Sequence, residues 1–138
     1  MTVREFLLRV RKQNHMLLVY EQELTNLQAH ASNISSPAFG DKVQGNHISS
    51  LDEIVEKIVM QADKVNKLWD TYIENKEKAA SMIGRIDDDA QKAVLYRYYI
   101  MGENWKTVSC QMHYTRRYIF KLHDIGIKEL SGIFKRVH

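Results

Sequence analysis

The chain of 138 residues is 44% hydrophobic and 27% charged, with a formal net charge of +3, which suits one soluble domain or a small module with an appendage. Its one proline and six glycines are too few for the many turns of an all-β fold, so the composition favours an all-α protein. The single cysteine excludes an internal disulfide and is typical of a reducing compartment.

Basic residues gather in the last third of the chain. Residues 1–86 hold 11 Lys and Arg and 11 Asp and Glu, whereas residues 90–138 hold 9 Lys and Arg against 3 Asp and Glu. This excess predicts a polyanionic partner, although a solvated basic face would give the same count. The apolar run Phe6–Leu8 is too short for a signal peptide, and no segment has the apolar length of a membrane span. We therefore expect a cytoplasmic protein that does not contact a membrane.

A long amphipathic helix is predicted near the start of the chain. Thr2 and Glu5 have the spacing of a capping box and can start this helix at Val3. Apolar residues then recur at intervals of three and four, with Gln13 in one slot, which is the heptad-like stripe of a core or a partner interface. The stripe consists of Phe6, Val10, Leu17, Tyr20, Leu24, Leu27 and Ala31.

A second long helix is predicted after a loop at about 32–49, which holds the only proline and two glycines. Ser50 and Glu53 repeat the capping-box spacing, and Gln61 and Asn75 interrupt the apolar stripe that follows. This stripe consists of Ile54, Ile58, Val65, Leu68, Tyr72, Ala79, Met82 and Ile86. Two such helices joined by one loop predict a long antiparallel helical hairpin over residues 1–86.

The second helix has an apolar face wider than this one stripe, because Val55, Val59, Ala62 and Trp69 lie beside it. A lone hairpin buries only one stripe of each helix. We therefore expect another surface to cover the extra residues, which is either the C-terminal module or a second copy of the chain. The second case would be a homodimer through the N-terminal helices.

Residues 87–138 are predicted to form a separate helical module. Asp87–Asp89 place negative charge at a helix N-terminus, and a cap is favoured over a metal site because three consecutive side chains on a helix do not converge. Gly102 is a natural helix stop. A short helix over 105–112, the residues "HYT" at 113–115 and a longer helix, which Thr115 can cap, then have the order of a helix-turn-helix.

Glycine at position 126 supports this reading. A glycine inside a helix costs about 1 kcal/mol relative to alanine, and a close approach to another helix would justify that cost. We therefore expect Gly126 to lie where the last helix crosses a neighbour.

The N-terminal end of the last helix is the part of a helix-turn-helix that enters the major groove of DNA. Arg116 and Arg117 lie there, and a planar guanidinium can pair with guanine or clamp a phosphate. An ordinary basic helix on a bundle surface is the alternative. The predicted DNA-binding residues are Trp105, Lys106, Thr115, Arg116, Arg117, Tyr118 and Lys121.

Other chemistry has less support in the sequence. Cys110, His113 and His123 suggest a metal site, but a structural zinc ion takes four ligands and no second cysteine exists. His123 could touch a phosphate or cover the core. No glycine-rich phosphate loop, G-x-S-x-G elbow or H-E-x-x-H helix occurs. We expect no metal, no cofactor and no enzymatic activity.

Residues 94–130, "VLYRYYIMGENWKTVSCQMHYTRRYIFKLHDIGIKEL", resemble region 4 of sigma-70-type factors. In that pattern an L-x-x-RY…G helix precedes a scaffold helix and a recognition helix. Ser109, His113 and Gly126 depart from it, standing for Ala, the turn Gly and a later Ala, and His113 makes the turn less standard because Gly accepts a positive φ more readily. The positions that align with the pattern, among which Gly126 carries a different residue, are Leu95, Arg97, Tyr98, Gly102, Trp105, Val108, Met112, Tyr114, Thr115, Ile119, Leu122, Gly126, Ile127 and Leu130.

Most of the chain also resembles the ArpU/RinA-like regulators of late phage transcription, including "SSPAFGDKVQGNHISSLDEIVEKI" and "YTRRYIFKLH". The resemblance implies sequence-specific binding of double-stranded DNA to regulate phage or prophage transcription, with RNA polymerase as a further possible partner. Two alternatives remain open: a helical protein–protein interaction module, and the DNA-recognition component of a phage packaging complex.

Overall fold

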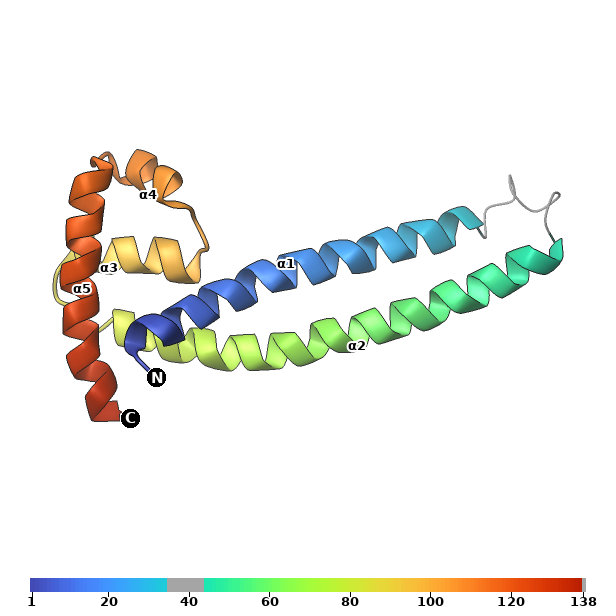
Figure 1. Ribbon diagram of the computed structural model, residues 1–138, viewed down its shortest axis with the longest axis horizontal. Helices are drawn as coiled ribbons and strands as arrows, with labels where there is room; N and C mark the ends of the chain where they lie inside the picture. The colour runs from blue at the N-terminus through green and yellow to red at the C-terminus, as the bar shows by residue number, and fades with distance from the viewer. Residues whose placement is uncertain (35–43, 138) are drawn as a thin grey trace. The chain divides into compact units, whose positions relative to one another are not determined.

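The computed structural model describes residues 1–34 and 44–137, and these residues form helices and connecting turns without a strand. In chain order the elements are α1 (Val3–Ile34), α2 (Gln44–Ile83), α3 (Asp89–Leu95), the π-helical segment η2 (Tyr96–Ile100), α4 (Trp105–Met112) and α5 (Arg116–Val137). Figure 1 shows α1 and α2 side by side in opposite directions, followed by the shorter helices. The predicted all-α fold, with a long antiparallel helix pair at its start, is confirmed.

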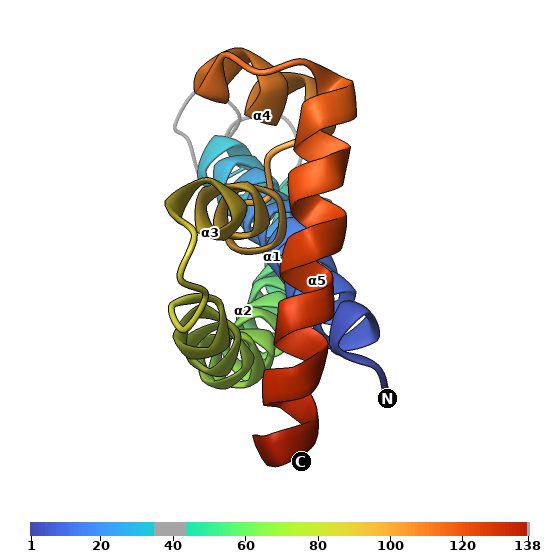
Figure 2. The same cartoon turned by 90° about the vertical axis from the view of Figure 1, so that its left-hand side faces the viewer.

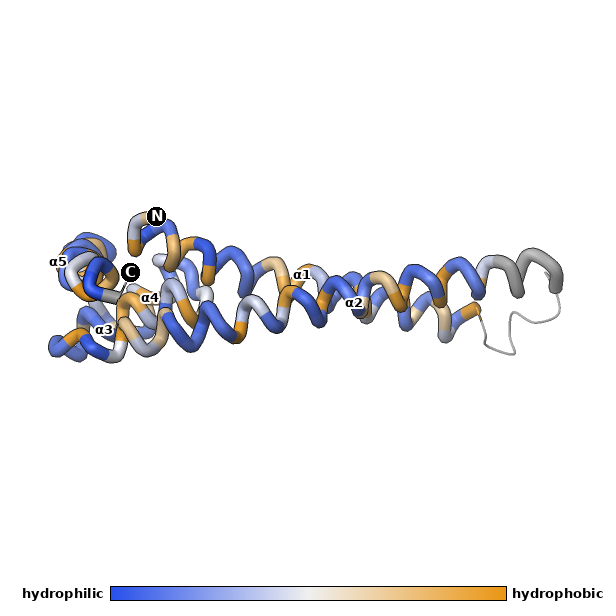
Figure 3. The backbone as a smooth tube through the Cα atoms, turned by 90° about the horizontal axis from the view of Figure 1, so that it is seen from below, coloured by the Kyte–Doolittle hydropathy of each residue, from blue (hydrophilic) through white to orange (hydrophobic). Residues whose placement is uncertain are grey.

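The chain divides into two compact units, and both long helices contribute to each. The first unit comprises Met1–His15 and Thr71–His138, and the second comprises Met16–Asp70. Figure 3 shows hydrophobic residues recurring along α1 and α2, as the heptad-like stripes predict.

In the first unit, the start of α1 pairs with the end of α2. The predicted capping box begins α1: the backbone N–H of Glu5 donates to Thr2 Oγ1 over 3.1 Å, and that of Thr2 donates to Glu5 Oε2 over 3.3 Å. The polar slots of the two stripes meet, because Asn75 Nδ2 donates to Gln13 Oε1 over 3.2 Å. These two amides therefore fix the register of the helix pair.

In the second unit, Gln61 occupies the polar slot and is buried. Its Nε2 donates to the carbonyl oxygen of Tyr20 and to Glu23 Oε2, each over 3.0 Å. The apolar side chains buried among the described residues of this unit are Leu17, Ile54 and Val65. Its core is thus a single thin seam.

The bounds of the first two helices differ from the predicted loop at about 32–49. Helix α1 continues to Ile34, and α2 begins at Gln44, before the predicted cap at Ser50. Capping-box spacing is compatible with a helix start and does not by itself prevent a helix from extending upstream. The part of the predicted loop at 35–43 lies outside the described residues.

The C-terminal helices of the first unit enclose a common core. Val94, Val108, Ile119 and Leu122 form its centre, and Figure 2 shows α3 and α4 along the same side of α5. A Cβ at Gly126 would lie 2.8 Å from Leu95 Cδ1. This confirms the predicted close approach, which takes place between α5 and α3.

Candidate nucleic-acid interface

A tight turn joins α4 to α5. His113 ends α4 in the left-handed conformation, with φ 60° and ψ 35°, and it is the one non-glycine residue with positive φ in the described part of the chain. The N–H of Tyr114 donates to the carbonyl oxygen of Ser109 over 3.3 Å, and Ser109 Oγ donates back to the carbonyl oxygen of Tyr114. The helix-turn-helix order predicted for α4 and α5 is therefore realised with histidine at the position where glycine is usual.

Thr115 caps the last helix, as predicted. Its Oγ1 accepts a hydrogen bond from the N–H of Tyr118 over 3.2 Å, and its carbonyl oxygen accepts the N–H of Ile119 over 3.0 Å. The cap fixes where α5 begins, and so it places the next two residues, Arg116 and Arg117, in the first turn.

The first turns of α5 present uncompensated positive charge. Arg116, Arg117 and Lys121 are exposed, and none of them forms a salt bridge with any residue of the described ranges. The ring of Tyr118 is 42% exposed and lies edge-on to Tyr114 at 4.8 Å between centroids. The cationic tip, defined as Thr115–Lys121, thus presents every side chain except that of the buried Ile119 to solvent.

The other two predicted residues lie at the start of α4. Lys106 is exposed. The ring of Trp105 stacks on Tyr98 at 3.7 Å and 8°, and its edges meet Phe120 and His123 at 5.2 Å and 5.3 Å. Trp105 is only partly exposed, so it holds α4, α5 and η2 together.

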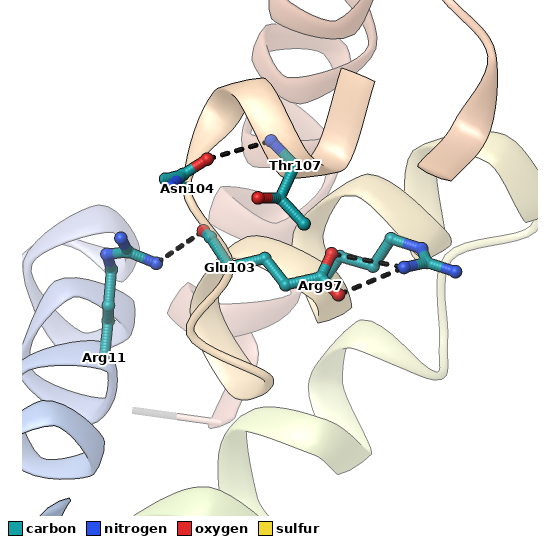
Figure 4. A network of polar contacts seen from close by, with 5 residues as sticks. All are labelled: Arg11, Arg97, Glu103, Asn104 and Thr107. Carbon is teal, nitrogen blue, oxygen red and sulfur yellow. Dashed lines mark hydrogen bonds and ion pairs between the residues drawn. The ribbon is translucent and has the colours of Figure 1, made fainter. Parts of the chain in front are cut away.

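A contact that the sequence did not reveal anchors this module to α1. Arg11 Nη1 donates to the carbonyl oxygens of Tyr98 and Glu103 over 2.6 Å and 2.8 Å, and its guanidinium lies 3.8 Å above the Tyr98 ring. Figure 4 shows Arg11 reaching from α1 toward Glu103. Together with Trp105, these side chains form a layered stack of guanidinium, phenol and indole.

The segment between η2 and α4 is held by two more polar interactions (Figure 4). Arg97 Nη1 lies 3.1 Å from both carboxylate oxygens of Glu103, and Asn104 Oδ1 accepts the N–H of Thr107 over 2.8 Å as the N-cap of α4. The Asn104 cap has a sequence signal, since asparagine favours this position. The partner of Arg97 has none, because it depends on the path of the turn.

Gly102 lies in this same turn with φ 76°. A Cβ at this position would lie 2.6 Å from Asn14 Nδ2, and the carbonyl oxygen of Gly102 is 3.1 Å from His15 Nε2. Glycine is therefore required both by its backbone conformation and by the close approach of α1.

His123 lies inside the module. Its side chain is 4% exposed, its Nε2 is 2.7 Å from the hydroxyl of Tyr99, and its Nδ1 is 3.1 Å from Asp124 Oδ1. Of the two roles left open by the sequence, the structure supports a place in the core. Burial lowers the pKa of His123, and the hydrogen bond to Asp124 acts against that shift. Burial also raises the pKa of Tyr99, to about 12.

The residues considered for a metal site are not gathered. Cys110 is exposed on α4, His113 lies in the turn, and His123 faces Tyr99. Within the described ranges, no three His, Cys, Asp or Glu side chains come together to hold an ion. In the acidic run Asp87–Asp89, the predicted helix cap is present, because Asp88 Oδ2 accepts the N–H of Gln91 over 2.8 Å.

The fold and the cationic tip define an all-α protein with a helix-turn-helix arrangement of α4 and α5. Residues 33–131 match the family described as DUF1492, "Protein of unknown function", and the chain belongs to that family. No curated protein and no solved structure matches the chain. In the described part of the chain, none of the helices combines the length and the apolar character that crossing a bilayer requires.

Proposed function

We propose that the protein binds double-stranded DNA sequence-specifically through the cationic tip, and that it regulates phage or prophage transcription in this way. The observation that carries the proposal is the exposure of Arg116, Arg117 and Lys121 without a salt-bridge partner among the described residues, on the first turns of the second helix of a helix-turn-helix. An arginine that is already paired would have to lose a salt bridge before binding DNA. These arginines need not.

The module also has the stiffness that groove recognition requires. Base readout depends on placing a few side chains within hydrogen-bond distance of base edges. The Thr115 cap fixes where α5 begins, and the aromatic contacts of Trp105 and the Gly126 crossing hold α5 against its neighbours. Trp105 therefore supports binding by position, and Lys106 at the adjacent exposed position supplies a phosphate contact.

The test is the double variant Arg116→Ala with Arg117→Ala, titrated by fluorescence anisotropy against a fragment selected from phage and host genomic DNA. We expect its affinity for the selected fragment to fall on the order of 100-fold or more, because each bidentate arginine contact contributes about 1–3 kcal/mol. The matched control is Lys128→Ala with Lys135→Ala, which removes the same charge from exposed positions further along α5.

The control should lose only the nonspecific share of affinity, and circular dichroism should show equal helicity in both variants. Equal losses in the two variants would mean that net charge, rather than the cationic tip, determines binding. Unchanged affinity of the arginine variant would overturn the proposal. Binding should also weaken steeply with added salt, because phosphate contacts release counterions.

A further inference from the structure

Helix α2 carries a second apolar row beside the one that packs on α1. Its members follow one another at intervals of four and three, which is the spacing of a coiled-coil seam. Figure 3 shows hydrophobic residues recurring along α2. This outer row is defined as Val55, Val59, Ala62, Asn66 and Trp69.

Four of the five residues of the outer row are exposed, and Ala62 is half-buried. Val55 and Val59 are 48% and 64% exposed, and Trp69 is 38% exposed. The indole N–H of Trp69 donates to Glu21 Oε1 on α1 over 2.8 Å, which holds the ring at the border between the two helices. Leu18 lies one turn before Glu21 on the same face of α1, and it is 60% exposed. The described residues thus leave an apolar strip along α2, which Leu18 extends onto α1.

This strip is more than scattered surface hydrophobicity. Single exposed apolar residues are ordinary, whereas a contiguous strip at heptad spacing marks a surface that receives another helix. The second unit also has little core of its own, since Leu17, Ile54 and Val65 are its buried apolar side chains among the described residues. A third helix laid along the strip would complete a bundle.

Charge identifies the chemistry of that third helix. Glu56, Asp63 and Asp70 follow one another at intervals of seven and form an exposed acidic row along one edge of the outer row. Asp63 is paired with Lys67 over 2.9 Å, but both side chains are largely exposed, so the pair screens the row only weakly. By sequence, Met16–Asp70 holds 8 Asp and Glu against 4 Lys and Arg, a net charge of −4.

We propose that the outer row docks an amphipathic helix of another protein, which has apolar residues at heptad spacing and Lys or Arg at the flanking positions. Apolar contact along the row supplies the affinity, and the acidic row selects basic flanks and fixes the orientation of the partner. Asn66 interrupts the row at a single position, so a polar residue opposite it would set the axial register.

A second copy of the chain fits this surface less well. Antiparallel pairing of two outer rows would place the acidic row of one copy against that of the other, where like charges repel. Parallel pairing would still bring together two units that each carry a net charge of −4. The surface is complementary to a basic helix rather than to itself.

The test uses the whole chain and a synthetic helical probe of about three heptads, with Leu at the two apolar positions and Lys at the flanking positions. A second peptide with Glu in place of Lys is its control. We expect the Lys peptide to bind in isothermal titration calorimetry and the Glu peptide not to bind. Asp63→Asn with Asp70→Asn should weaken binding of the Lys peptide and flatten its dependence on salt.

Two double variants locate the surface. Val55→Ser with Val59→Ser should weaken binding of the Lys peptide roughly 10-fold or more, because two exposed valines lose their apolar contact. The control is Val19→Ser with Met60→Ser, which removes two exposed apolar side chains, 49% and 72% exposed, from positions outside the outer row. It should leave the affinity unchanged within about 3-fold, a difference below 1 kcal/mol.

Equal weakening by both double variants, or equal binding of the Lys and Glu peptides, would overturn the proposal. A concentration-dependent dimer in light scattering that Val55→Ser with Val59→Ser dissociates would also overturn it, because the occupant would then be a second copy. DNA binding by these variants should be unaffected, so a failure here is distinct from a failure of the DNA-binding proposal.

Discussion

The two units of the protein have opposite charge and different packing. The first holds 16 Lys and Arg against 9 Asp and Glu, a net charge of +7, whereas the second has a net charge of −4. The first unit buries apolar side chains from every one of its helices, and the second buries one thin seam and exposes a strip beside it. The difference shows that a net charge of +3 for the whole chain conceals two units of opposite charge.

This separation has a physical consequence for binding. Under the proposed function, DNA would be attracted by the charge of the basic unit and repelled by that of the acidic one, which would favour binding at the cationic tip. A basic helix experiences the opposite preference and is steered toward the outer row. The two proposed partners therefore need not compete for one surface.

The largest expected effect tests the difference in packing directly. Leu95 is fully buried where α3 meets α5, and Leu17 is 3% exposed in the thin seam of the second unit. Leu95→Ala should lower the free energy of unfolding by about 3–5 kcal/mol, since the surrounding helices cannot collapse into the cavity. Leu17→Ala should cost about 2–3 kcal/mol, because two helices with an open side can adjust.

Urea unfolding followed by circular dichroism measures both changes. Native-state hydrogen exchange gives a second reading, with slower exchange expected for α3 and α5 than for the α1 and α2 segments of the second unit. Equal costs for the two leucine variants, together with equal protection, would mean that the two units are packed alike.

A smaller effect is expected at the turn where α1 approaches Gly102. Gly102→Ala should lower the free energy of unfolding by about 1–3 kcal/mol, because the new Cβ meets Asn14 and alanine disfavours a positive φ. The matched control is Gly132→Ala in α5, where the nearest atom to a Cβ is Arg136 Nη2 at 3.9 Å. This control should stabilise the protein by about 0.5–1 kcal/mol.

Thermal unfolding of both variants measures these changes. Destabilisation by Gly132→Ala as large as that by Gly102→Ala would show that loss of glycine is harmful anywhere in the first unit. In that case the docking of α1 on this turn would not be the cause.

The buried pair of His123 and Tyr99 should make stability depend on pH. Burial lowers the pKa of His123 in the folded state, so below the ordinary histidine pKa of about 6.5 the unfolded chain binds a proton that the folded chain does not. The free energy of unfolding should therefore be highest above that pH and should fall as the pH decreases. Its slope should be at most about 1.4 kcal/mol per pH unit for one proton.

The test measures the free energy of unfolding of the natural chain and of His123→Gln at several pH values. The pH runs from about 7.5 to about 5, which is roughly the range in which histidine titrates. The variant should lose overall stability and show a shallower slope. An unchanged slope would assign the pH dependence to other groups.

Local features of the fold could be predicted from the sequence, because each depends on residues within one turn of each other. The Thr2 capping box and the Thr115 cap were predicted from spacing, and the close approach at Gly126 from the cost of glycine in a helix. The partners of the polar slots could not be predicted. Gln13 and Asn75 are 62 residues apart, and their pairing depends on the register of two helices.

The same limit applies to the candidate site. The cationic tip follows from charge and helix order, but its support does not. Arg11 is 87 residues from Tyr98 in sequence, and the π-helical segment that contains Tyr98 has no sequence signature of its own. The aromatic packing of Trp105 likewise depends on rings that come together only in the folded unit.

The smallest expected effect concerns the left-handed residue of the turn between α4 and α5. Replacing His113 by glycine should raise the free energy of unfolding by up to about 1 kcal/mol, because glycine adopts φ 60° without steric cost, although it also increases the entropy of the unfolded chain. The matched control is Gln111→Gly in α4, an exposed helical position, which should cost about 1 kcal/mol. Urea unfolding of the two variants gives the comparison. If His113→Gly destabilises the protein as much as Gln111→Gly does, the imidazole of His113 must contribute a favourable interaction that outweighs its backbone strain. Histidine would then stabilise this turn, and the turn would not simply tolerate a histidine where glycine fits better.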